Sequence, residues 1–65
     1  MIKSVIRCPN GMVLVFDEDG EQVPEYQGYY TDVRASILRD TPPDTVFSYF
    51  HDTAPRFEDV PREDW

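Results

Sequence analysis

The stretch Met12–Phe16, which reads MVLVF, is a run of five apolar residues with turn-forming sequence on both sides. Side chains alternate across a β-strand, so Val13 and Val15 face one side while the methionine, leucine and phenylalanine face the other. Both sides of this predicted strand are therefore apolar and need cover. A chain of 65 residues has room for about one helix. The second side must be covered by the C-terminal residues or by another protein surface.

A β-hairpin is predicted to include this stretch. Residues 2–8 also alternate as a strand does, with the even-numbered positions on one face and the odd-numbered positions, including Val5, on the other. The dipeptide Asn10-Gly11 between the two runs favours a type I′ turn, in which both central residues have positive φ. We expect the second strand to end at Asp17, where a polar turn over residues 17–20 follows.

One helix is predicted in the middle of the chain. Tyr30, Val33 and Ile37 recur at helical spacing, and the flanking signals give a length of about three turns. Pro42-Pro43 ends the helix, because a residue that precedes proline is disfavoured in the α conformation. Residues 21–27, which include a proline, are expected to form an irregular connection into the helix.

Residues 46–51, with the sequence VFSYFH, predict a third strand, and a helical turn that begins at Asp44 is the alternative. The fold class is therefore α+β. We expect a single domain over residues 1–53 with β-β-α-β order, a three-stranded, mainly antiparallel sheet and one helix on one face. If the first strand is central, it is antiparallel to both neighbours and the spatial order is 2-1-3.

Residues 54–65 are expected to form an acidic C-terminal tail that is partly ordered or disordered, because they contain two prolines and no apolar periodicity. The large apolar residues of this tail are Phe57, Val60 and Trp65. Three alternatives remain open for them. The tail folds back over the open sheet face, docks on a partner protein, or stays disordered.

The charge of the chain restricts its partners. Residues 1–16 hold two basic residues and no acidic ones, whereas residues 17–65 hold all 13 acidic residues, and the net charge is −7. Such an excess repels nucleic-acid phosphates and anionic lipids, so we expect no nucleic-acid or membrane partner. Cys8 is the single cysteine, which suits a reducing compartment, and no secretory signal is apparent. We therefore expect a cytoplasmic location.

Two groups of residues invite a chemical interpretation. The acidic turn offers Asp17, Asp19 and Glu21 as weak candidates for a divalent metal, with Glu25 nearby, but its spacing does not match an EF-hand loop. Cys8 and His51 form the only nucleophile–base pair in the chain, and they need a shared pocket to act. We predict no catalytic residues and no cofactor.

The function predicted from the sequence is that of a small, acidic, non-enzymatic protein-interaction module. Its apolar contacts are expected to be Val13, Val15, Phe57, Val60 and Trp65, used against a protein partner or in self-association as a homodimer. The alternative is a small-ligand or divalent-metal site at the acidic turn, residues 17–21.

Overall fold

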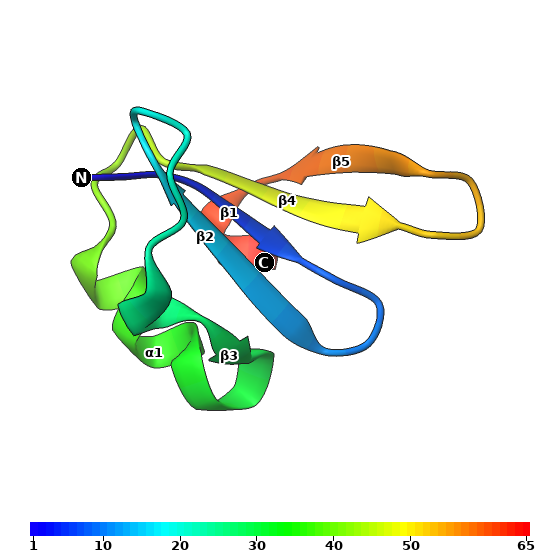
Figure 1. Ribbon diagram of the computed structural model, residues 1–65, viewed down its shortest axis with the longest axis horizontal. Coiled ribbons are helices and arrows are strands. Elements are labelled where there is room, and N and C mark those ends of the chain that lie inside the picture. Colours follow the sequence, from blue (N-terminus) through cyan, green and yellow to red (C-terminus); the bar gives the residue numbers. More distant parts are fainter.

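One mixed sheet and one α-helix make up the computed structural model, which describes all 65 residues (Figure 1). The helix α1 covers Tyr30–Asp40, and short 3-10 turns lie at η1 (Pro24–Tyr26) and η2 (Arg62–Asp64). The strands are β1 (Ile2–Arg7), β2 (Met12–Asp17), β3 (Gly28–Tyr29), β4 (Val46–His51) and β5 (Arg56–Val60). The α+β class is confirmed, but the sheet has five strands in the order β3-β2-β1-β4-β5 rather than three.

The predicted hairpin of β1 and β2 is confirmed, and its turn differs from the expected type. The Gly11 N–H donates to the Cys8 carbonyl at 3.0 Å, which closes a turn with Pro9 and Asn10 at its centre. No residue other than glycine has positive φ, so the type I′ prediction is wrong. Proline holds φ negative at the first central position, and only Gly11, with φ 88°, takes the left-handed conformation.

The register of β1 shifts between Ile2 and Ser4, and this shift changes which residues face the core. Strict alternation predicts that Ile2 and Val5 lie on opposite faces. The irregularity inserts an extra residue, so both side chains are buried in the same core cluster. From Ser4 onward the even-numbered residues lie on the face opposite to Val5.

The central strand β1 pairs in parallel with β4, so the prediction that it is antiparallel to both neighbours is wrong. The reason is the two-residue strand β3, which lies just after the segment expected to be irregular. It pairs antiparallel with β2 and so returns the chain to the direction of β1 before the helix begins. α1 therefore connects β3 to β4, which run in the same direction, as a helical crossover requires.

The helix α1 packs on one face of the sheet, and the core lies between them. The buried cluster contains Val5, Val13 and Val15 from the sheet, Ile37 from α1, and Phe47 from β4. The helix ends as predicted before Pro42-Pro43, where Thr41 already has an extended backbone. This helix lacks the length and hydropathy needed to cross a membrane.

The C-terminal residues are part of the same sheet, so the prediction of a separate tail over residues 54–65 is corrected. β5 pairs antiparallel with β4 over its whole length, and the β4–β5 hairpin extends away from the helix (Figure 1). Beyond β5 the chain folds back, and Trp65 is buried with 2% of its surface exposed. Its ring lies 5.0 Å from that of Phe47 and 5.1 Å from that of Tyr30, measured between centroids.

Polar contacts hold this folded-back end in place. The indole Nε1–H of Trp65 donates to the Ser48 carbonyl at 3.3 Å. The Tyr49 hydroxyl donates to the Asp64 carbonyl at 2.9 Å. The Arg62 guanidinium donates four hydrogen bonds, at 2.6 to 3.3 Å, to oxygens of residues 38, 41 and 42. These oxygens lie at the C-terminal end of α1, where carbonyls lack helical partners and the helix dipole is negative, so a cation is stabilising there.

Candidate functional site

The face of the sheet opposite to α1 is the most distinctive surface of the molecule. Residues that lie directly opposite each other in paired strands share a face, so the register assigns its members. We call this set the uncovered sheet face. Its apolar members are Ile6, Met12, Leu14, Phe16, Tyr29, Val46, Phe50 and Phe57, and its polar members are Ser4, Ser48 and Asp59.

Three apolar side chains of this face are unusually exposed for their type. The chain has four strongly exposed large hydrophobic residues, and three of them belong to the uncovered sheet face. Tyr29 is 59% exposed, Val46 is 41% exposed and Phe57 is 61% exposed. They come from β3, β4 and β5, so the exposed apolar surface reaches from one edge of the sheet to the other. Large contiguous apolar surfaces of this kind are typical of interaction sites.

The uncovered sheet face is also almost free of charge. Charged residues make up 29% of the chain, yet Asp59 is the only one among the eleven members of this face. The Asp59 carboxylate accepts a hydrogen bond from the Ser48 hydroxyl at 3.1 Å. The Phe50 and Phe57 rings pair beside them with centroids 5.3 Å apart. The other acidic residues of the protein therefore lie outside this surface.

The apolar contacts predicted from the sequence divide into two groups. Val13, Val15 and Trp65 are buried in the core under α1, with at most 2% of their surface exposed, so they have almost no surface to offer a partner. Val60 is half-buried at the margin of the same core. Only Phe57 lies on the uncovered sheet face. The folded-back end covers the same sheet face as the helix, not the open one, because Trp65 packs against Phe47.

Most residues of this surface are not among those that the sequence predicts to contact a partner. Leu14 and Phe16 lie on one side of the Met12–Phe16 strand, and the alternation correctly separates them from Val13 and Val15. The sequence-based prediction gave the valine side to a partner, whereas the structure buries that side under α1. The valines lie under the helix because their short branched side chains allow α1 to approach the sheet closely. Tyr29 lies between the segment expected to be irregular and the predicted helix, and a two-residue strand has too little periodicity to be recognised.

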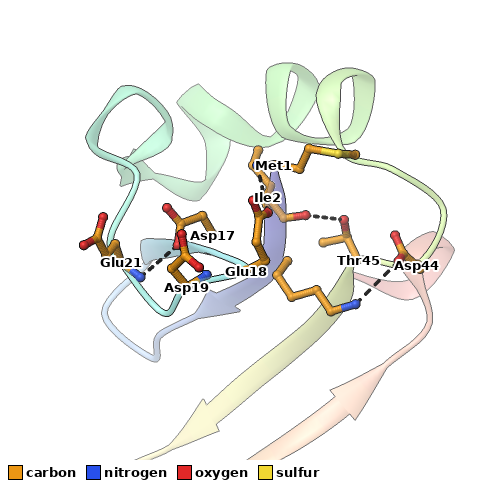
Figure 2. A network of polar contacts seen from close by, with 9 residues as sticks. Met1, Ile2, Asp17, Glu18, Asp19, Glu21, Asp44 and Thr45 are labelled. Atoms are coloured by element: carbon orange, nitrogen blue, oxygen red, sulfur yellow. Dashed lines mark hydrogen bonds and ion pairs between the residues drawn. The ribbon is translucent and has the colours of Figure 1, made fainter.

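The acidic turn after β2 has a structural role in this fold (Figure 2). The Asp17 carboxylate accepts hydrogen bonds at 2.9 Å from the backbone N–H groups of Asp19 and Glu21, so it already holds its own turn. The Glu18 carboxylate points away, toward the Met1 ammonium 2.9 Å from it. This hydrogen bond lowers the pKa of Glu18 and raises the pKa of the Met1 amino group. No group of three potential ligands lies close enough to hold a metal ion.

The structure places Cys8 and His51 in the same cleft, but no hydrogen bond joins their side chains. Both line an open cleft of about 440 Å³ where β1 and β4 end. His51 Nε2 lies 2.7 Å from Glu58 Oε1, on the neighbouring strand β5. Burial raises the pKa of the Cys8 thiol, so the thiol is mostly protonated at neutral pH. A protonated thiol is a poor nucleophile, and this arrangement does not favour cysteine catalysis.

Comparison of this chain with protein-family models, curated proteins and solved structures found no match.

Proposed function

We propose that this chain is a non-enzymatic interaction module of the cytoplasm that self-associates, with two copies pairing through their uncovered sheet faces. One observation supports this above all. The face opposite to α1 collects three of the four strongly exposed large hydrophobic residues and only one charge. Interfaces between identical subunits are more apolar than the rest of a protein surface and are poor in charged residues at their core.

The size of the face suits a dimer of small subunits. Strands about 4.8 Å apart and about 17–20 Å long give the five-stranded sheet a face of roughly 400 Å² in projection. Aromatic and aliphatic side chains project from this face, so its accessible surface area is larger than its projected area. A standard stable interface buries about 800 Å² on each partner, and weak interfaces bury less. Face-to-face pairing therefore predicts a dimer of moderate stability.

The apolar composition of the face favours a second copy as the partner. Eight of its eleven members are apolar, and its two serines, Ser4 and Ser48, lie on the neighbouring strands β1 and β4. A two-fold axis through the centre places the same surface against itself. Two sheets packed at about 10 Å then bury the apolar residues of both copies between them.

Charge gives this proposal a distinctive salt dependence. Each copy carries a net charge of −7, and the two copies repel each other at low ionic strength. Salt screens that repulsion, because the Debye length is about 8 Å at physiological ionic strength. Self-association should therefore strengthen as salt is added. Docking on a basic protein partner predicts the opposite trend, since salt weakens an attraction between opposite charges.

The test is the mass of the protein in solution across a wide range of concentrations, measured by sedimentation equilibrium. The monomer has a mass of 7.6 kDa, and we expect the mass to rise toward twice that value. Phe57→Glu should abolish the rise, because it places a carboxylate within an apolar interface. Phe57 is exposed in the monomer, so the variant should still fold.

Ala35→Glu is the matched control, since it adds the same charge on an exposed position of α1, away from the uncovered sheet face. It should leave the association unchanged. A monomeric mass of the wild-type chain at every concentration and at high salt overturns the proposal. Equal loss of association in both variants also overturns it, because the effect then comes from net charge and not from the face.

A further inference from the structure

The cleft that contains Cys8 and His51 arises from the way the two hairpins separate. The parallel pairing of β1 with β4 extends as far as Arg7 and Tyr49. Beyond that point each strand turns into its own hairpin, and the two turns diverge (Figure 1). The resulting cleft has a volume of about 440 Å³ and is lined by residues 7–9, Gly11 and residues 49–53. A volume of a few hundred Å³ is enough for a small ligand.

Arg7 is the distinctive residue of this cleft. Its guanidinium carbon lies 3.7 Å from the centroid of the Tyr30 ring and 5.6 Å from that of the Tyr49 ring. Stacking on an aromatic face holds the planar guanidinium in one orientation. It leaves the N–H donors at the edge of the plane free, because these donors point sideways from the stack.

No oxygen acceptor in the protein uses those donors. Arg7 makes no hydrogen bond and no ion pair, although the chain has 13 carboxylates. The other arginines that pack against the protein all have oxygen partners, as Arg34 and Arg62 do. Arg56 also lacks a partner, but its side chain lies exposed on β5. Arg7 is thus a half-buried, oriented cation whose hydrogen-bonding capacity is unused.

We propose that this cleft binds a small anionic ligand, with the Arg7 guanidinium as the group that recognises a carboxylate or phosphate. A fixed guanidinium fork matches the two oxygens of either group. The apolar walls from Tyr49 and Phe50 accommodate the rest of the ligand. Asp52 is the only carboxylate that lines the cleft, and it leaves Arg7 unpaired. The cleft shares only Phe50 with the uncovered sheet face, and its recognition group, Arg7, lies outside that face.

The experiment is a titration of the ¹⁵N-labelled full chain, followed by amide chemical shifts at constant ionic strength. One arm uses inorganic phosphate and the other uses acetate, with chloride as the balancing ion in both. We expect saturable shifts confined to the amides of residues 7–11 and 49–53 in at least one arm. The arm with the tighter binding identifies the chemistry of the ligand.

Arg7→Gln should weaken this binding about tenfold or more, because it removes a charge-assisted hydrogen bond. Arg7→Lys keeps a cation over the rings but lacks the planar guanidinium fork. This variant provides the same test if Arg7→Gln does not fold. It should weaken the binding as well. Arg56→Gln, which removes an equally unpaired arginine outside the cleft, should leave it unchanged. Shifts that stay linear in both arms, spread over all basic residues, or persist in both Arg7 variants overturn the proposal, as does the absence of any shift.

Discussion

Arg62→Met tests whether the folded-back C-terminal end contributes to stability. The substitution keeps an unbranched apolar side chain on Phe47, whose ring centroid lies 5.0 Å from the guanidinium carbon, and removes only the charged donors. The acceptors that lose their partner are the carbonyls of Leu38, Thr41 and Pro42, together with the Thr41 hydroxyl. All of them belong to the C-terminal end of α1 or follow it directly.

The expected cost follows from these contacts. A hydrogen bond with a charged donor contributes about 1.5–3 kcal/mol, and a cation at a helix C-terminus contributes about 0.3–1 kcal/mol. The four bonds share one half-exposed guanidinium, and water replaces part of what is lost, so they do not add. We expect a loss of about 2–3 kcal/mol in the free energy of unfolding. A domain of this length has a total stability of only about 3–10 kcal/mol, so Tm should fall by roughly 10–20 °C.

Trp65 provides the assay, because it is the single tryptophan of the chain and is buried. Urea unfolding is followed by its fluorescence and, in parallel, by circular dichroism of α1. The native emission should be that of an indole shielded from water, and both signals should shift together in Arg62→Met. Arg56→Met is the control, since this exposed arginine has no polar partner and surface changes of that kind cost within about 0.5 kcal/mol.

Two results contradict this reasoning. Native emission typical of a water-exposed indole means that the C-terminal end does not pack on the core in solution. An equal and small loss of stability in the Arg62 and Arg56 variants means that the bonds to the end of α1 contribute nothing. In either case the core must be closed by other residues.

Three further predictions concern the stability of the domain. Ile37→Ala should cost about 2–5 kcal/mol in urea unfolding, because Ile37 is fully buried between α1 and the sheet, and a loss below 1 kcal/mol would contradict that packing. Gly28→Ala should cost about 1–2 kcal/mol, since its φ is 153° and a Cβ there meets the Val33 side chain at 3.3 Å; unchanged Tm would refute the strain. The Arg39 guanidinium, and then a tyrosine hydroxyl, hold the pKa of Asp40 below its usual value. The ionised carboxylate therefore stabilises the fold above the unfolded pKa of about 3.9, and this contribution is lost as the pH falls through the lower folded pKa. Tm measured against pH should fall less steeply below about pH 4 in Asp40→Asn than in the wild type, and identical slopes would argue against the interaction.

The local elements of this fold follow from short-range patterns in the chain. The alternation of Met12–Phe16 predicts β2, and the spacing of Tyr30, Val33 and Ile37 predicts α1, because each pattern matches the period of its element. Pro42-Pro43 predicts the end of the helix for a steric reason that needs no tertiary contact. These features depend on residues close to one another in the sequence, so the sequence alone predicts them.

The strands that were missed lack such a pattern. β3 has two residues, and β5 is an exposed edge strand of mixed charge whose pairing with β4 decides its conformation. Neither presents an apolar period. Because β3 was not predicted, the parallel pairing of β4 with β1 was not predicted either. The direction of the strand that follows a helical crossover depends on the strand that precedes the helix.

The sequence by itself determined that one strand is apolar on both sides and that a single helix covers one of them. Only the tertiary structure decided that the valines lie under the helix, that Trp65 joins them, and that Tyr29, Val46 and Phe57 remain exposed on the opposite face. The cleft at Arg7 likewise exists only because β1 and β4 are neighbours. These cases have the same physical reason. Packing between segments far apart in the chain decides which of two apolar faces is buried and which distant strands pair. No local period in the sequence encodes that packing.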